Sequence, residues 1–320
     1  MKVLMSADTV GGVFTYAVEL ISGLHERGVE VSLATFGAPT TPAQRDALRR
    51  AGVGAWHESS LRLEWMSDPW RDLDAAEHWL LELEQREAPD VVHLNAYAHG
   101  GAAFSAPVLV TGHSCVLSWW QAVHGKHAPA GWERYRQTAS GGIRSARAVV
   151  APSRWMLAQL REHYGPLPPG SRTIRNGSST PSAAADPTVK EPFVLAAGRM
   201  WDAAKNFEAL LGAARIMSSS AEIAVAGELH GGDGADGGGP AGLEPQPARL
   251  RLLGGLDRQA LADWRARAAI FAAPARYEPF GLGILEAARD RCALVLGDIP
   301  SLRELWEDSA LYVPPEDTRA

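Results

Sequence analysis

The chain alternates short apolar runs with segments whose apolar residues recur at helical spacing. Runs such as Val108-Leu-Val are apolar at consecutive positions, which is typical of parallel strands covered on both faces. The clearest helical pattern follows the first run, where five apolar residues share one face. They are Phe14, Ala17, Val18, Ile21 and Leu24. The first half is predicted to form strands at Lys2–Ala7, Glu30–Thr35, Asp90–Leu94, Pro107–Gly112, Ala148–Ala151 and Arg172–Ile174.

A second alternation follows the segment Asn176–Pro187, whose turn formers and small residues are typical of an interdomain linker. Its predicted strands are Phe193–Ala197, Glu222–Ala226, Leu250–Leu253, Ala269–Ala273, Leu294–Gly297 and Ala310–Val313. Its predicted helices are Phe207–Met217, Gln259–Ala266, Leu282–Ala288 and Ser301–Trp306. We therefore expect two Rossmann-like, doubly wound α/β domains, residues 1–180 and 181–320, with a ligand cleft at the carboxyl ends of their strands.

Composition narrows the class of protein. A chain of 320 residues is long for one core, which also favours two domains. The formal net charge of −6 argues against a nucleic-acid binder, because such proteins need a basic surface. No secretion signal or membrane-spanning run is visible, so a cytoplasmic location is expected. The two cysteines, Cys115 and Cys292, lack metal-ligand spacing and are expected to be buried thiols.

The most informative stretch is Arg276-Tyr-Glu-Pro-Phe-Gly-Leu-Gly-Ile-Leu-Glu286. It places Glu278 and Glu286 on either side of a Pro-Phe-Gly corner that opens a predicted helix. Free N–H groups at Phe280, Gly281 and Leu282 would receive an anion, most naturally a phosphate. The two carboxylates would accept hydrogen bonds from hydroxyl groups, as sugars and riboses supply. A solvated helix glutamate is the alternative for each of them.

Glu-Pro-Phe-Gly-Leu followed by Leu-Glu-Ala resembles the signature of the retaining glycosyltransferases of family four, also called glycosyl transferases group 1. The resemblance extends over most of the chain. It implies the GT-B fold, in which two Rossmann-like domains face each other. Members continue through further C-terminal helices, and these crossover helices are apparently missing here, because the chain stops soon after its last predicted strand.

Other residues fit the same resemblance. Arg199 and Lys205 follow the first strand of the second half, in a Gly-Arg and Lys-Asn pattern, and two cations there would neutralise a diphosphate. Gly11 and Gly12 follow the first strand of the chain and match the family's glycine-rich loop, which contacts the donor phosphates. His113 matches a histidine that contacts the donor sugar. The residue after it is often aspartate in the family, whereas Ser114 stands here.

The resemblance implies that a sugar moves from a nucleotide-diphosphate donor to an acceptor hydroxyl, with retention at the anomeric carbon and without a metal or cofactor. Glu278, His113, Arg199 and Lys205 would be catalytic. Tryptophans cluster in the first half, so a carbohydrate or lipid-linked acceptor and a peripheral membrane contact are both left open.

Two alternatives remain at this point. A nucleotide-sugar epimerase shares the architecture but needs no acceptor, and a non-catalytic nucleotide-sugar binding protein would use the same pocket. A dehydrogenase is disfavoured, because the Gly-x-Gly-x-x-Gly fingerprint is absent. The Gly-rich segment between Gly227 and Pro247 lacks the lysine of a phosphate-binding loop and is expected to be a surface loop.

Overall fold

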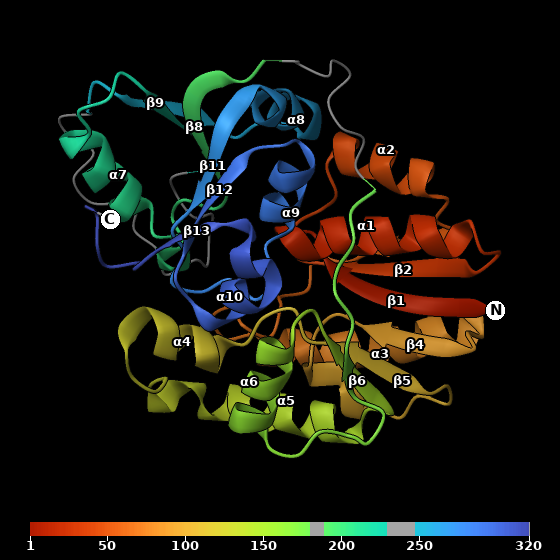
Figure 1. Cartoon of the computed structure of the whole chain (residues 1–320). Helices are drawn as coiled ribbons and strands as arrows, with labels where there is room; N and C mark the ends of the chain where they lie inside the picture. Colours follow the sequence, from red (N-terminus) through yellow and green to blue (C-terminus); the bar gives the residue numbers. More distant parts are fainter. Residues whose placement is uncertain (180–188, 229–246, 320) are drawn as a thin grey trace. The chain divides into compact units, whose positions relative to one another are not determined.

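The computed structural model describes residues 1–179, 189–228 and 247–319. Two compact units are present, one formed by Met1–Gln121 with Lys126–Gly177, the other by Ser178–Ala320 with Ala122–Gly125. Each unit is built on its own parallel sheet (Figure 1). The predicted linker and the predicted Gly-rich loop fall largely outside the described residues.

The first part of the chain alternates strands and helices as the apolar pattern predicts. Its strands are β1 (Lys2–Asp8), β2 (Glu30–Phe36), β3 (Ala55–Glu58), β4 (Val91–Leu94), β5 (Val108–Thr111), β6 (Ala148–Ala151) and β7 (Arg172–Thr173). Its helices are α1 (Gly12–His25), α2 (Pro42–Ala51), α3 (Trp70–Glu87), α4 (Val116–His124), α5 (Glu133–Ser145) and α6 (Arg154–Tyr164), with short 3-10 turns η1 (Ala98–Gly101) and η2 (Ala130–Trp132).

The second unit repeats this alternation. Its strands are β8 (Glu191–Ala197), β9 (Glu222–Ala226), β10 (Leu250–Gly254), β11 (Ala268–Ala273), β12 (Ala293–Gly297) and β13 (Leu311–Val313). Its helices are α7 (Phe207–Ile216), α8 (Arg258–Arg267), α9 (Leu282–Arg289) and α10 (Pro300–Trp306), with 3-10 turns η3 (Ala203–Lys205) and η4 (Glu307–Ser309).

The two sheets follow the same strand order, except that the first has one more strand, β7, at its end. Among the described residues the first sheet runs β3-β2-β1-β4-β5-β6-β7 and the second runs β10-β9-β8-β11-β12-β13, and every pairing is parallel. Each order reverses once, between β1 and β4 and between β8 and β11. Ligands of doubly wound sheets bind at such a reversal, outside the carboxyl ends of the strands. The topology therefore identifies where a site belongs in each unit.

Consecutive apolar residues of the central strands face two different cores. In β1, Val3 and Met5 pack with α1 and α2, whereas Leu4 packs with α3, α5 and α6 on the opposite face (Figure 1). In β8, Leu195 packs with α8, α9 and α10, whereas Ala196 packs with α7. This coverage explains the unbroken apolar runs, because a strand buried on both faces needs no polar side. Each fully buried leucine contributes about 2 kcal/mol.

Capping residues fix the ends of two of the helices that cover the sheets, α2 and α8. Helix α2 begins with a capping box, in which the side chain of Thr41 accepts from Gln44 N and the Gln44 side chain accepts from Thr41 N. It ends at Gly52, whose φ of 77° suits a left-handed C-cap. Helix α8 begins at Asp257, whose carboxylate accepts from Ala260 N at 2.8 Å.

Among the described strands, β3 is the one that the apolar pattern did not predict. Its four residues, Ala55 to Glu58, are half-buried or exposed, and it pairs with β2 alone at the edge of the sheet. A short edge strand carries too few buried positions to produce a recognisable run. The predicted buried state of Cys115 and Cys292 is confirmed. No described helix is long and apolar enough to cross a membrane.

Candidate functional site

Most of the predicted site residues come just after the carboxyl ends of strands that lie at or next to the reversals of strand order. In the second unit, Arg199 and Lys205 follow β8 and Glu278 follows β11. In the first unit, Gly11 follows β1 and His113 follows β5. These are the positions at which doubly wound sheets hold ligands.

Lys205 and Glu278 form the centre of the group in the second unit. Lys205 Nζ donates to Glu278 Oε2 at 2.6 Å, and the side chains are 26% and 17% exposed. The other carboxylate oxygen, Oε1, accepts from the backbone N–H of Phe280 at 3.3 Å. Glu278 therefore keeps only part of its acceptor capacity for a ligand, while the Lys205 ammonium retains further donors.

Hydrogen bonds hold the β8 loop and the β11 loop against each other. Asn206 Nδ2 donates to the carbonyl oxygens of Pro274 at 2.8 Å and Pro315 at 2.7 Å. The N–H of Arg276 donates to Ala204 O at 2.9 Å. Asn206 itself has a φ of 57°, a left-handed conformation that asparagine tolerates better than most residues. These contacts bring Lys205 to Glu278 although they are 73 positions apart.

Ser301 supports Glu278 from a third segment. Its hydroxyl donates to the carbonyl oxygen of Glu278 at 2.7 Å, and its own side chain is fully buried in α10. The backbone of Glu278 is thus fixed by a group outside the β11 loop. With its backbone anchored and its two oxygens held by Lys205 and Phe280, the carboxylate has one orientation, which favours recognition of hydroxyl groups.

Arg199 lies in the same loop as Lys205 but does not contact Glu278. Its Nη2 donates to Asp202 Oδ2 at 3.1 Å, and its guanidinium lies 5.4 Å from the centre of the Trp201 ring. The other oxygen of Asp202 accepts from Ala204 N at 3.0 Å, which shapes the turn η3. The Arg199 side chain is 42% exposed, so most of its N–H groups remain available to an anion.

The Pro-Phe-Gly corner ends at Gly281, which is the N-cap of α9. Its φ of 86° is left-handed, and an added Cβ would lie 2.7 Å from Ile284 Cδ1. Glycine is therefore required there on both counts. Helix α9 begins at Leu282, so its first N–H groups follow the corner as predicted. The Phe280 N–H, by contrast, is directed at Glu278.

Glu286 lies inside α9 and contacts a buried arginine. Arg265 Nη1 lies 2.8 Å from Glu286 Oε2, and Arg265 Nε donates to Asp290 Oδ2 at 2.8 Å. The three side chains are 2%, 12% and 3% exposed for Arg265, Glu286 and Asp290. The guanidinium of Arg265 therefore faces both carboxylates and fixes the orientation of Glu286. Its predicted contact with a ribose stays a prediction.

In the first unit, Gly11 and Gly12 begin α1. Gly11 is the N-cap with φ 82°, and a Cβ added to Gly12 would meet no atom within 4 Å. The loop before them is fixed, because Thr9 Oγ1 donates to Ala38 O at 2.7 Å and Val10 N donates to Asp8 Oδ1 at 3.0 Å. A rigid loop with open space over its backbone suits close approach of a ligand.

His113 follows β5 in the same unit. Its Nε2 lies 2.7 Å from Asn95 Oδ1, and the Tyr16 ring packs against it with 4.5 Å between ring centres. Burial and, to a smaller extent, the nearby His93 together lower the pKa of His113 to about 3. Burial also lowers the pKa of His93 to about 4. His113 is therefore a neutral hydrogen-bonding group at physiological pH.

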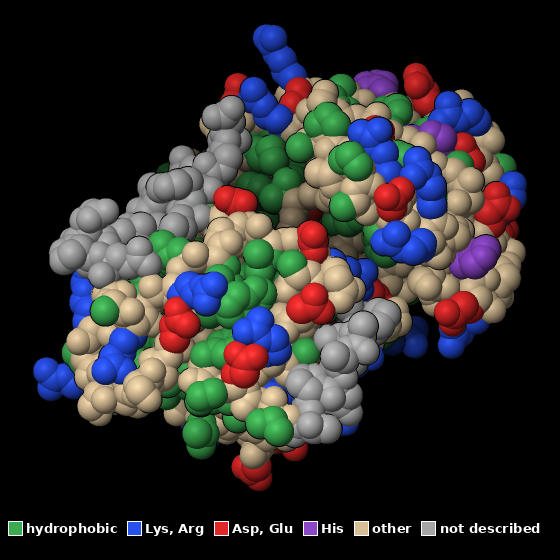
Figure 2. Space-filling model, turned by 90° about the horizontal axis from the view of Figure 1, so that it is seen from above, with side chains coloured by type: hydrophobic (Ala, Val, Ile, Leu, Met, Phe, Trp, Pro, Cys, Tyr) green, Lys and Arg blue, Asp and Glu red, His purple; other side chains and the backbone are tan. Residues whose placement is uncertain are grey.

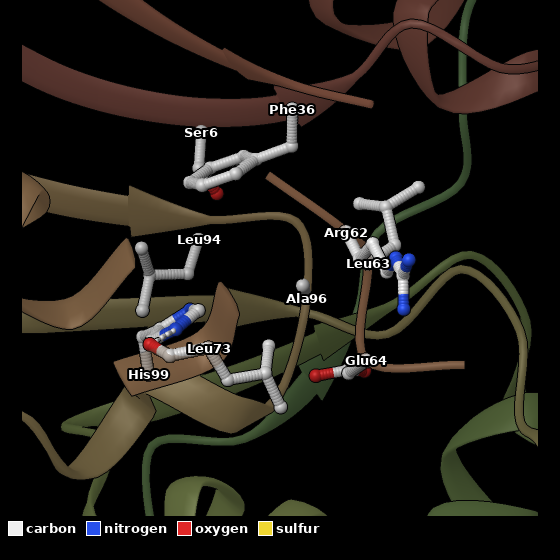
Figure 3. Close-up of a pocket in the computed structure, with 9 residues that line it drawn as sticks. All are labelled: Ser6, Phe36, Arg62, Leu63, Glu64, Leu73, Leu94, Ala96 and His99. Atoms are coloured by element: carbon white, nitrogen blue, oxygen red, sulfur yellow. Dashed lines mark hydrogen bonds between the residues drawn. The ribbon is translucent and has the colours of Figure 1, made fainter. Parts of the chain in front are cut away.

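A small cavity lies elsewhere in the first unit, between Phe36, Leu73 and Leu94 (Figure 3). Its volume of about 20 Å³ holds roughly one water molecule, so it cannot hold a sugar. Glu64 at its margin accepts from the N–H groups of Tyr97 and Ala98 at 3.0 and 2.6 Å. Burial raises the pKa of Glu64 to about 7.

Neither the distribution of surface charge nor a group of metal ligands identifies a further site in the described residues. Acidic and basic side chains are interspersed over the face seen in Figure 2, in keeping with the small net charge of −6. Within the described residues, no group of three or more His, Cys, Asp or Glu side chains has the geometry of a metal site.

Several residues that orient the site residues were not predicted from the sequence. Asn206 carried a signal, because it is the second residue of the Lys-Asn pair. Asn95 directly follows the predicted strand Asp90–Leu94 but belongs to no motif. Ser301, Arg265 and Tyr16 carried no signal, since each acts through a partner that is distant in sequence.

Two family models match the chain, one in each half. Residues 10–180 match the family model described as Glycosyltransferase Family 4, and residues 191–320 match the one described as Glycosyl transferases group 1. A search among curated proteins finds no match to this chain.

Solved structures resemble the chain along nearly its whole length. Sucrose-phosphate synthase from Thermosynechococcus elongatus is 19% identical with a TM-score of 0.74, covering 100% of this chain and 87% of that one. HepE from Anabaena, solved in complex with UDP-glucose, is 15% identical with a TM-score of 0.75, covering 99% and 86%. A glycosyltransferase from Rickettsia africae is 15% identical with a TM-score of 0.70, covering 100% and 85%. These likenesses confirm the predicted GT-B fold.

Proposed function

The chain belongs to glycosyltransferase family 4, and from this premise we propose that it transfers a hexose from a nucleotide-diphosphate sugar to an acceptor hydroxyl, with retention and without a metal. The observation that carries the proposal is the contact of Lys205 with Glu278 beside the Phe280 N–H, at the carboxyl ends of β8 and β11. It joins a cation for a phosphate to a carboxylate for hydroxyl groups.

The cations stabilise the departing diphosphate. Lys205 has three N–H donors and gives one to Glu278, so others remain for a phosphate oxygen. Arg199 donates one N–H to Asp202, and the remaining N–H groups of its guanidinium can donate to a phosphate. Cleavage of the sugar–phosphate bond increases the negative charge on the diphosphate, and cations fixed beforehand lower the barrier to that step. The N–H groups around Gly281 and Leu282 add to this stabilisation.

The carboxylates bind hydroxyl groups. Glu278 would repel the diphosphate if it were unpaired, but Lys205 compensates its charge at 2.6 Å. Its remaining lone pairs accept from hydroxyls of the sugar. Glu286, oriented by Arg265, accepts from the ribose. The acceptor attacks from the face of the leaving group, and a phosphate oxygen takes its proton.

His113 is proposed to contact the donor sugar and not to act as an acid. Because its pKa is about 3, His113 is a neutral imidazole at pH 7 and has no imidazolium proton to give to a leaving group. Gly11 and Gly12 let the donor approach the backbone of the first unit. The acceptor stays a carbohydrate or a lipid-linked saccharide, and the cytoplasmic location stays a prediction.

A panel of uridine, guanosine and adenosine diphosphate sugars, measured by thermal shift, tests donor binding. UDP-glucose is the first choice, because HepE was solved with it. Release of free nucleoside diphosphate on adding a saccharide acceptor then tests transfer, with and without EDTA. The double variant Arg199→Ala Lys205→Ala should bind donor but release little product. Turnover equal to that of the wild type would remove the electrostatic role, and conversion of the donor without an acceptor would indicate an epimerase.

A further inference from the structure

A row of hydrogen-bonded polar groups connects His113 through Asn95 to Ser6 in the central strand β1. Its Nε2 lies 2.7 Å from Asn95 Oδ1, and Asn95 Nδ2 donates to the carbonyl oxygen of Ser6 at 2.6 Å. The backbone N–H of Asn95 donates to Ser6 Oγ at 3.1 Å. Ser6 is buried in β1, and Asn95 follows β4. Asn95 is therefore held by both its side chain and its backbone.

The carbonyl oxygen of Ser6, at the end of this row of polar groups, decides which atom donates in each of its hydrogen bonds. A backbone carbonyl only accepts, so Asn95 must turn its NH₂ toward Ser6 and its carbonyl oxygen toward His113. An amide oxygen also only accepts. Nε2 of His113 must therefore carry the proton. Because the ring is neutral, its lone pair lies on the other nitrogen, Nδ1, which has no hydrogen-bond partner within residues 1–179, 189–228 and 247–319.

The plane of the ring is fixed as well. Tyr16 of α1 packs against His113 with 4.5 Å between ring centres and 68° between ring planes. Thr111 Oγ1 lies 2.7 Å from the Nε2 of His93, whose ring is 6.4 Å from that of Tyr16 between centres. Burial raises the pKa of Tyr16, so its hydroxyl keeps its proton. The imidazole is thus held at one nitrogen by Asn95 and packed against the Tyr16 ring, with the other nitrogen left for a ligand.

Resting on the proposed function, we propose that Asn95 is a positioning residue that holds His113 in the Nε2-protonated form, so that Nδ1 accepts a hydrogen bond from a hydroxyl group of the donor sugar. An acceptor-only nitrogen recognises a hydroxyl by its proton. It gives no such bond to a ring oxygen or a methyl group. The donor class is therefore a sugar that carries a hydroxyl at the position facing His113.

Nitrogen NMR of the full chain labelled with ¹⁵N-histidine reads the tautomer directly. His113→Gln identifies the signals, because it removes both of them. We expect Nδ1 to resonate as an unprotonated, pyridine-type nitrogen and Nε2 as a pyrrole-type nitrogen with a slowly exchanging proton. A proton on Nδ1 would overturn the proposal whatever the activity of the protein.

Two variants separate positioning from general structure. In Asn95→Ala the slowly exchanging Nε2 proton should be lost to exchange, and kcat/KM should fall about tenfold, the equivalent of one hydrogen bond. Thr111→Val removes the hydroxyl beside His93 and Tyr16, so it should alter the His93 signals and leave the Nε2 proton of His113 protected. Retention of that proton in Asn95→Ala would overturn the role of Asn95, even if activity fell.

Titration with UDP-glucose and with UDP links the tautomer to the donor. The sugar nucleotide should shift the Nδ1 signal, and UDP alone should not. If UDP-glucose stabilises the protein in the thermal shift but leaves Nδ1 unmoved, the inference fails and the proposed function survives. If no sugar nucleotide of the panel stabilises the protein, the proposed function fails, and with it the sugar contact, while the tautomer assignment is still judged by the NMR signals.

Discussion

Replacement of Lys205 by methionine is the most direct test of how the second unit works. Methionine keeps most of the apolar length of the side chain but removes the ammonium that lies 2.6 Å from Glu278. If Lys205 stabilises charge on the departing diphosphate, the variant should lose turnover. If Lys205 only neutralises Glu278, the loss should disappear once Glu278 is neutral as well. The two roles therefore make different predictions for the double variant Lys205→Met Glu278→Gln.

The size of the effect follows from Coulomb's law. Lys205 is 26% exposed, so an effective dielectric constant of about 20 applies, and a unit charge about 4 Å away would be stabilised by about 4 kcal/mol. Only the charge that develops in the transition state counts toward turnover. Half a charge gives about 2 kcal/mol, or about 30-fold in kcat. Removal of a single stabilising donor from other enzymes costs about 100- to 1000-fold. We expect a loss within the range set by these two figures.

Steady-state release of nucleoside diphosphate gives kcat and KM for the wild type, Lys205→Met, Glu278→Gln and the double variant. Arg267→Met is the matched control, because Arg267 Nε lies 2.6 Å from Glu191 Oε1 in an exposed pair of the same unit, away from the site residues. It should leave kcat unchanged. A double variant that regains most of the wild-type kcat, or a single variant that loses less than threefold, would refute the electrostatic role.

Three further variants test the remaining assignments. Glu286→Ala should raise KM for the donor about tenfold, with little change in kcat, because a ribose contact is equal in the ground and transition states; an unchanged KM would contradict it. Arg265→Met should destabilise the fold by about 3–5 kcal/mol in urea unfolding, since two buried carboxylates, those of Glu286 and Asp290, would lose the guanidinium that faces them; a loss below 1 kcal/mol would be inconsistent with that role. His113→Gln should flatten the pH dependence of stability. The folded pKa of about 3 lies below the ordinary value of 6.5, so the stabilisation by neutral His113 is complete above pH 6.5 and declines as the pH falls toward 3. Urea unfolding at pH 7 and 5 should then show a smaller loss in the variant than in the wild type, and an equal loss would argue against the depressed pKa.

Much of the candidate site could be predicted from the sequence, because its residues lie in short segments with strong local signals. Gly281 is required by a left-handed φ, and the Pro-Phe-Gly corner precedes α9 as predicted. Arg199 and Lys205 follow a strand whose apolar run was unmistakable. The strand predictions mostly agree with the structure to within one or two residues, since the central strands are buried on both faces. Strand β3 was missed because an edge strand of four partly exposed residues has no such pattern.

Sequence by itself determined the fold class, the family and the loops that carry the charged groups, because apolar periodicity and turn chemistry act over a few neighbouring residues. Only the tertiary structure decided which groups meet. Lys205 reaches Glu278 across 73 positions, and Arg265 reaches Glu286 from another helix. The proton of His113 is assigned by Asn95, whose orientation depends on a carbonyl 89 positions away in β1. Hydrogen-bond polarity and charge pairing depend on distance in space, and parallel strand order brings together segments that no local pattern connects.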